Sequence, residues 1–272
     1  MSELQTGFAE INGAQIYYQV AGQGEIVTFV HAGVADHRLW DAQFEALQSK
    51  YRVISYDLRG YGQTTAPNAP FSHVDDLHAL LVYLGVKRTA LVGCSLGGTT
   101  ALDFVLTHLQ MVTALVMVCS NPSGYQPQGA PTPLIMQLIA ASQANDAEKM
   151  AQLAVHIWGA GENRQPEQLD PKFRDLVYEM SLIGFKNQAD GLPHPTEVAQ
   201  TAISRLSEVH IPTLIIDSAE DSPSVHAAGE LMAREIAGAQ RVVMPNAAHL
   251  PSLEHPAEFN NLLEPFLKAA LK

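Results

Sequence analysis

Six short apolar runs, rich in β-branched residues, recur along this sequence and restrict the folds that it can adopt. They begin at Ile26, Val53, Ala90, Ala114, Thr213 and Arg241. Four of the five intervals between starts are 24 to 37 residues long, which leaves room for a strand, a crossover helix and two loops. This repeat predicts a mostly parallel sheet with helices on both faces. The Asn12-Gly13 pair within residues 8–20 predicts a β-hairpin that precedes the first of these runs.

The remaining interval, between the fourth and fifth runs, is 99 residues long. It holds a stretch rich in Pro, Gly and Gln, followed by helical patterns at 134–144, 147–158 and 171–182. We therefore expect a helical cap at 122–205, inserted after the sixth strand into a core formed by 1–121 and 206–272. Trp158 and the other apolar residues of this segment are expected mainly to pack against one another.

Composition and charge limit the partners and the location that we expect for this protein. The chain has 272 residues, 47% hydrophobic, with a formal net charge of −12. An acidic surface disfavours nucleic acid and anionic membranes as partners. Cys94 and Cys119 lie inside apolar runs and are expected to be reduced core residues. With neither a secretory signal nor a membrane-spanning run in the sequence, we expect a soluble, cytoplasmic protein.

The segment Leu91-Val92-Gly93-Cys94-Ser95-Leu96-Gly97-Gly98 has the form G-x-S-x-G between a strand run and a helical one. Small flanking residues allow a tight strand-to-helix turn that projects Ser95 from the edge of the sheet. Cys94 is expected to point into the core. The context favours a nucleophilic Ser95 over a purely structural glycine-rich turn.

A serine hydroxyl needs a base and a carboxylate that orients the base. His249 follows the last apolar run, on a loop at the carboxyl edge where Ser95 also lies. The loop after the fifth run offers Asp217, Glu220 and Asp221. We expect Asp217 to belong to the strand and Asp221 to be the orienting acid, which gives the order Ser, Asp, His.

Five ordered motifs together resemble the α/β-hydrolase superfamily, in its capped, serine-nucleophile, esterase- or lactonase-like form. They are Phe29-Val30-His31-Ala32-Gly33 with Trp40, Asp57-Leu58-Arg59-Gly60-Tyr61-Gly62, the Ser95 turn, Pro212-Thr213-Leu214 with Asp221, and His249 with Glu254 and Pro256. The resemblance covers about residues 8 to 271. It implies an α/β-hydrolase fold, with a mostly parallel central sheet flanked by helices and a cap after the sixth strand.

By this resemblance Ser95 is the nucleophile, His249 the general acid/base and Asp221 its partner. The oxyanion hole would use the backbone N–H groups of Leu96 and Gly33, and a shift of one residue would give the second role to Val34.

The resemblance also gives Asp57 and Arg59 a structural role beside the nucleophile. Asn121, at the edge where some relatives carry the acid, cannot serve as the anion.

A serine nucleophile restricts the types of reaction that the enzyme could catalyse. Dehalogenase and epoxide-hydrolase relatives need Asp where this chain has Ser95. We expect hydrolysis of a carboxylic ester or lactone of a small apolar molecule, which is the only partner that the sequence suggests. Carbon–carbon bond hydrolysis, cofactor-free perhydrolysis and receptor-like ligand binding are the alternatives. No cofactor and no metal is expected, because the dinucleotide, phosphate-loop and zinc motifs do not occur.

Overall fold

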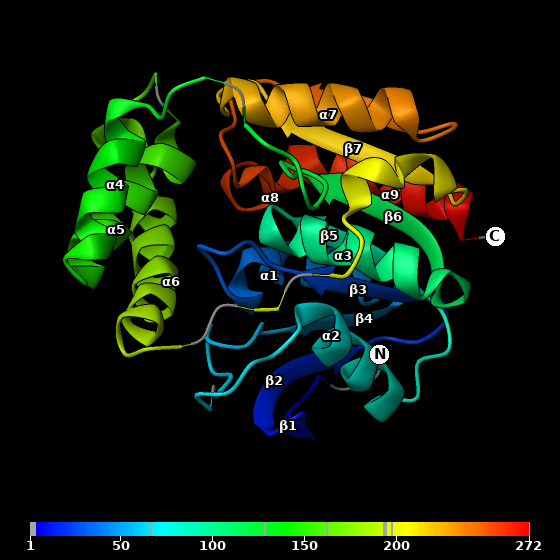
Figure 1. Cartoon of the computed structure of the whole chain (residues 1–272). Coiled ribbons are helices and arrows are strands. Elements are labelled where there is room, and N and C mark those ends of the chain that lie inside the picture. Colours follow the sequence, from blue (N-terminus) through cyan, green and yellow to red (C-terminus); the bar gives the residue numbers. More distant parts are fainter. Residues whose placement is uncertain are drawn as a thin grey trace.

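An eight-stranded sheet forms the centre of the computed structural model, which describes residues 4–65, 67–127, 129–161, 163–192, 195–196 and 198–271 (Figure 1). The strand order is β1-β2-β4-β3-β5-β6-β7-β8. The strands are β1 Gln5–Ile11, β2 Ala14–Ala21, β3 Ile26–Val30, β4 Arg52–Tyr56, β5 Thr89–Cys94, β6 Val112–Val118, β7 Thr213–Ser218 and β8 Gln240–Met244.

The six expected runs are the six strands β3 to β8, and each begins within two residues of its expected start. These six strands pair in parallel, whereas β2 is antiparallel to both of its neighbours. Asn12 and Gly13 form the predicted hairpin turn with positive φ angles of 47° and 80°. The α/β fold predicted from the sequence is therefore confirmed.

Helices cover both faces of the sheet. Side chains of α2, α3 and α7 pack with Leu91 on one face, and those of α1 and α9 pack with Val92 on the other. The α-helices are α1 Asp41–Leu47, α2 His73–Tyr83, α3 Leu96–Thr107, α4 Pro133–Gln143, α5 Ala147–Ala154, α6 Pro171–Ala189, α7 Pro223–Glu235, α8 Pro251–Glu254 and α9 Pro256–Ala270. Short 3₁₀ turns occur at His37–Trp40, Leu109–Met111, Pro166–Gln168, Ala202–Ser204 and Leu206–Glu208.

Three helices follow β6 as expected, and Figure 1 shows α4, α5 and α6 together beside one end of the sheet. The pattern at 147–158 is not one α-helix, because a π-helix, Val155–Ala160, continues from α5. Helix α6 extends to Ala189, beyond the expected end at 182. The Ser181 hydroxyl donates to the Val34 carbonyl at 3.0 Å and ties α6 to the loop after β3.

Within the described ranges, no helix is long and apolar enough to cross a membrane.

Candidate active site

Ser95 occupies the turn between β5 and α3 with φ 51° and ψ −118°, a backbone conformation that is strained for a residue with a side chain. Backbone hydrogen bonds of Ser95 hold this conformation. The Ser95 N–H donates to Val118 O at 2.9 Å, and the Ser95 carbonyl accepts from the Ser120 hydroxyl at 2.7 Å and the Thr99 N–H at 3.0 Å. The side chain is half-buried, at the carboxyl edge of the sheet.

The glycines on either side of Ser95 are required by close backbone approach. A Cβ atom on Gly97 would lie 2.2 Å from the Val30 carbonyl oxygen of the neighbouring strand. A Cβ atom on Gly93 would lie 2.3 Å from the Gly97 carbonyl oxygen. Neither contact is possible, so the G-x-S-x-G pattern follows directly from the packing of this turn.

His249 lies on the loop after β8 and its Nδ1 is 2.7 Å from Oδ2 of Asp221, on the loop after β7. The other carboxylate oxygen of Asp221 accepts the Ser222 N–H at 2.7 Å. Both side chains are buried, at 6% and 5% exposed. If the Asp221 carboxylate is ionised, Nδ1 is the donor, and Nε2 is then free to accept a proton. Asp217 belongs to β7, as expected.

The structure brings Ser95 and His249 to the same edge of the sheet, because β5 and β8 both end there. Among the described residues, no hydrogen bond joins the two side chains. Such a bond often forms only when substrate is bound.

Contacts from the segment 122–205 hold the loop that carries His249. The His249 N–H donates to the Trp158 carbonyl at 3.2 Å. The preceding residue, Ala248, donates its N–H to Oε2 of Glu254 at 2.9 Å, and Arg164 pairs with Oε1 of Glu254 at 2.6 Å. Sequence reasoning identified Glu254 but missed Arg164, because no local pattern marks a partner 90 residues away.

Gly33 and Leu96 are adjacent in space. A Cβ atom on Gly33 would lie 3.4 Å from the Leu96 side chain, and both residues are half-buried. Val34 is buried, and its carbonyl is the one that Ser181 of α6 contacts.

Asp57 and Arg59 are fully buried and hydrogen-bonded within the protein, although Nη1 of Arg59 is buried without a hydrogen-bond partner among the described residues. The Asp57 carboxylate accepts from His37 Nδ1 and from the Gln63 N–H, both at 2.7 Å. Arg59 pairs with Asp76 at 2.9 Å. These contacts are those of structural residues, as expected.

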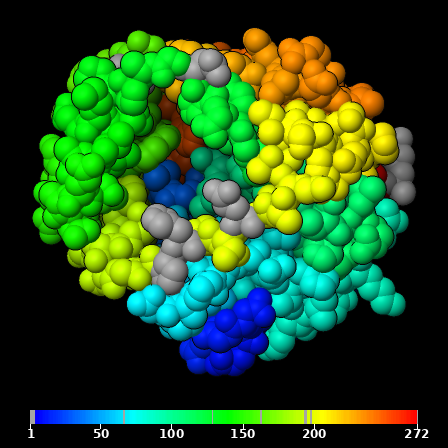
Figure 2. All heavy atoms as spheres, in the orientation of Figure 1, coloured from blue at the N-terminus to red at the C-terminus, as the bar shows by residue number. Residues whose placement is uncertain are grey.

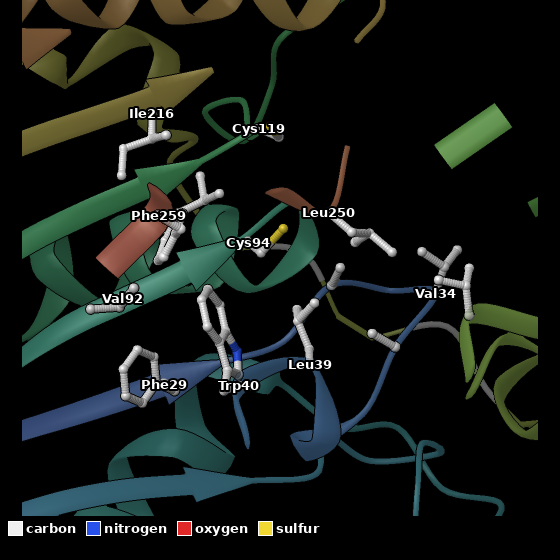
Figure 3. Packing of buried hydrophobic residues seen from close by; sticks show 14 of the residues in the cluster. Phe29, Val34, Leu39, Trp40, Val92, Cys94, Cys119, Ile216, Leu250 and Phe259 are labelled. Atoms are coloured by element: carbon white, nitrogen blue, oxygen red, sulfur yellow. The ribbon is translucent and has the colours of Figure 1, made fainter. Parts of the chain in front are cut away.

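Cys94 and Cys119 are buried free thiols at the ends of the adjacent strands β5 and β6 (Figure 3). Cys94 belongs to the core cluster, as expected, and its sulfur is 3.5 Å from the His249 carbonyl. Cys119 lies directly after β6, where its sulfur contacts the Ser218 hydroxyl at 3.2 Å. Both expected core cysteines therefore also lie beneath the loops that carry Asp221 and His249.

A cavity of about 550 Å³ lies against His249 and Asp221. Apolar side chains of the segment 122–205 form much of its wall, among them Ile135, Ile157 and Trp158. Trp158 thus lines a cavity, in addition to the packing role expected of it. Figure 2 shows a hollow on this side of the molecule, between the green helices and the core.

Comparison with known proteins agrees with this architecture. A family model described as "alpha/beta hydrolase fold" matches residues 25–256. The chain is 26% identical to 3-oxoadipate enol-lactonase 1 of Acinetobacter baylyi, over 89% of this chain and 88% of that protein. It is 24% identical to the pimeloyl-[acyl-carrier protein] methyl ester esterase of Pectobacterium carotovorum, over 94% of this chain and all of that protein. Among solved structures, Est816, described as an N-acyl homoserine lactone degrading enzyme, superposes with a TM-score of 0.77 at 27% identity, covering 95% of this chain and 99% of that one.

Proposed function

Since this chain belongs to the α/β-hydrolase family and is an enzyme of the ester-hydrolase type, we propose that it cleaves a carboxylic ester or lactone of a small apolar substrate through an acyl-serine intermediate. The observation that carries the proposal is the 2.7 Å contact between His249 and Asp221 at the edge that also presents the strained Ser95. The enol-lactonase relative and the lactone-degrading structural neighbour support a lactone as one substrate type to test.

In the proposed reaction the Ser95 Oγ attacks the carbonyl carbon while its proton passes to Nε2 of His249. The Asp221 carboxylate holds the ring in the tautomer with hydrogen on Nδ1 and stabilises the imidazolium. Nε2 then gives the proton to the leaving alkoxide. Nε2 then takes a proton from water as the water attacks the acyl-serine, and it returns that proton to the Ser95 Oγ as the acid is released. With a lactone, the alcohol and the acid leave as one hydroxy acid.

Negative charge on the carbonyl oxygen would be met by the backbone N–H of Leu96 and that of Gly33. Leu96 begins α3, so its N–H has no partner within the helix. Gly33 lies so close to Leu96 that an added Cβ atom would be 3.4 Å from the Leu96 side chain, which supports Gly33 over Val34 as the second donor; the Val34 carbonyl instead accepts from Ser181 of α6.

The segment 122–205 is proposed to act as the cap. Its apolar residues line the cavity beside His249, and a volume of about 550 Å³ suits a small substrate. We assign the apolar part of the substrate to this cavity.

A fluorophosphonate probe and a panel of esters and lactones test the proposal. The wild type should gain the mass of the probe and turn over at least one ester or lactone, and Ser95→Ala should do neither. Equal labelling of the two proteins would contradict the nucleophile assignment. Turnover no faster than that of Ser95→Ala on every substrate would instead indicate a ligand-binding protein.

A further inference from the structure

At the proposed site, a third side chain of different chemistry lies next to the pair formed by Asp221 and His249. The sulfur of Cys119, a carboxylate oxygen of Asp221 and a ring nitrogen of His249 all lie within 4.8 Å of one another. They come from the ends of β6, β7 and β8, which are neighbours in the sheet. The topology therefore joins a thiol, a carboxylate and an imidazole, the three ligand types that zinc sites use.

We propose that Cys119, Asp221 and His249 form a site for a thiophilic divalent cation such as Zn²⁺ or Cd²⁺, and that an ion bound there blocks catalysis. The binding site stands on geometry alone, whereas the block rests on the proposed function.

The donor distances suit such an ion after small movements. Zinc binds sulfur at about 2.3 Å and nitrogen or oxygen at about 2.0–2.2 Å, so tetrahedral N and O ligands lie roughly 3.3 Å apart. The contact between His249 and Asp221, now 2.7 Å, has to open by about half an ångström. The sulfur lies within 4.8 Å of the other two ligand atoms, so it has to approach them by at most about an ångström. Rotations of buried side chains on loops can supply shifts of this size.

The ligand atoms have lone pairs available. Within the described part of the chain, the Cys119 sulfur has two hydrogen-bond partners, the Ser218 hydroxyl at 3.2 Å and, more weakly, the Ala248 carbonyl at 4.0 Å. Each Asp221 oxygen accepts one hydrogen bond and keeps a second lone pair. No lysine or arginine of the described ranges forms an ion pair with Asp221.

A second cluster of similar composition, Asp36, His37 and Asp57, does not offer the same opportunity. Arg38 pairs with both oxygens of Asp36, and the oxygens of Asp57 already accept from His37 and the Gln63 N–H. A cation there would have to displace a guanidinium.

Two cavities border Asp221, one of the three proposed ligands, whereas the buried Cys119 is not among their lining residues. One, of about 530 Å³, is lined by the carboxylates of Glu220 and Glu230 as well. The other, of about 550 Å³, also touches His249. Carboxylates along the approach, on a chain of net charge −12, raise the local concentration of cations.

Coordination of the ion changes where the protons of Cys119 and His249 lie, and this would stop catalysis. A thiol binds such an ion as the thiolate, so Cys119 releases one proton to solvent when its sulfur binds the ion. A neutral imidazole that binds the ion through Nδ1 carries its proton on Nε2. Nε2 can then no longer accept the proton of Ser95. The ion should therefore lower kcat and leave KM nearly unchanged.

Cadmium titration tests the site with two independent readouts, the ultraviolet charge-transfer band of a cadmium–thiolate bond and ester turnover. Cys119→Ser is compared with Cys94→Ser, a matched control that removes the other buried thiol. The wild type and Cys94→Ser should show the band and lose activity, with both effects reversed by a chelator. Cys119→Ser should lack the band and need at least about tenfold more Cd²⁺ for half-inhibition, relative to its own metal-free rate.

A band that persists in Cys119→Ser, or equal inhibition of Cys119→Ser and the wild type, would overturn the proposal. His249→Asn keeps the thiol and should bind Cd²⁺ about tenfold or more weakly by the same band, and unchanged affinity would also overturn it. The band does not depend on catalysis, so a wild type without esterase or lactonase activity refutes the proposed function and leaves the test of the cation site intact.

Discussion

Replacing Arg164 by Gln should both destabilise the protein and slow its turnover. The guanidinium contacts Glu254 Oε1 at 2.6 Å and Oε2 at 3.3 Å, and it also donates to the carbonyls of Ala160 at 2.7 Å and Asn246 at 3.3 Å. Glu254 in turn accepts the N–H of Ala248, next to the proposed base. The substitution removes the cation and leaves a buried carboxylate beside the histidine loop.

The size of the effect follows from burial. The side chains of Arg164 and Glu254 are 23% and 9% exposed, so the pair is intermediate between an exposed and a fully buried ion pair. Exposed ion pairs contribute about 0.2–1 kcal/mol, and breaking a fully buried pair costs about 3–5 kcal/mol. We expect a loss of about 2 kcal/mol in the free energy of unfolding. For a chain of this size that lowers Tm by about 3–4 °C.

Turnover should fall as well, because Ala248 and the proposed base share one short loop. A displacement of the base by about 1 Å can cost roughly 10²-fold in rate, so a looser loop should lower kcat about tenfold with little change in KM. Arg164→Lys keeps the charge but not the two-pronged geometry, and it should recover part of both losses.

Thermal unfolding and steady-state ester kinetics measure these effects, and Arg174→Gln is the control. Arg174 pairs with Asp175 on the surface, where the two side chains are 35% and 67% exposed, so its loss should cost no more than about 1 kcal/mol. A double-mutant cycle with Glu254→Gln should return a coupling of about 1–2 kcal/mol. Zero coupling, or a Tm for Arg164→Gln equal to that of Arg174→Gln, would refute the reasoning.

Three further substitutions test other parts of the structure. Asp221→Asn should lower kcat by about 10⁴-fold in the ester assay while Tm stays close to that of the wild type; a rate near that of the wild type would remove Asp221 from the proposed triad. Gly97→Ala should cost about 3 kcal/mol in urea unfolding, whereas Gly159→Ala, whose Cβ would meet its nearest neighbour at 3.6 Å, should cost nothing. Burial raises the pKa of Asp103 to about 6, so the folded state binds this proton more tightly than the unfolded chain and loses stability as pH rises from about 4 to about 6. Asp103→Asn should therefore gain about 2–3 kcal/mol on the wild type between pH 4 and pH 7, and a difference that does not change with pH would contradict this account.

The strands could be predicted from the sequence because a parallel sheet covered on both faces needs continuous apolar runs. In β5 neighbouring residues such as Leu91 and Val92 are both fully buried, on opposite faces, so no polar residue interrupts the run. The helices were less predictable at their ends. Gly184 sits inside α6, where a Cβ atom would lie 2.8 Å from the Tyr61 ring. Position 184 is glycine because α6 packs closely on the core. From the local sequence alone, a glycine required by close packing cannot be distinguished from a glycine that ends a helix.

The π-helix after α5 escaped prediction for a related reason. The apolar spacing of 147–158 is compatible with α and π geometry alike, because a π-helix adds only one residue to a turn. The two geometries differ in the tertiary contact that they allow. In this conformation the Trp158 carbonyl accepts the N–H of His249, a partner far away in the sequence.

In the candidate site, too, contacts between residues far apart in the sequence could not be predicted. Ser95, Asp221 and His249 could be proposed from motifs because each lies in a recognisable turn at the carboxyl edge of the sheet. Cys119 was identified only as a core residue, since its closeness to Asp221 depends on β6, β7 and β8 being neighbours. Arg164 has no motif at all.

These long-range contacts have a consequence for how the two parts of the enzyme act together. The histidine loop is held from the core by Asp221 and from the segment 122–205 by the Trp158 carbonyl and Arg164. Any outward movement of the segment near Trp158 must lengthen the bond to the His249 N–H and pull on the Arg164–Glu254 pair. The geometry of the proposed base is therefore coupled to the position of the segment that lines the apolar cavity. A substrate too large for that cavity should consequently be turned over slowly even when it binds, so its kcat should fall more steeply with size than its KM rises.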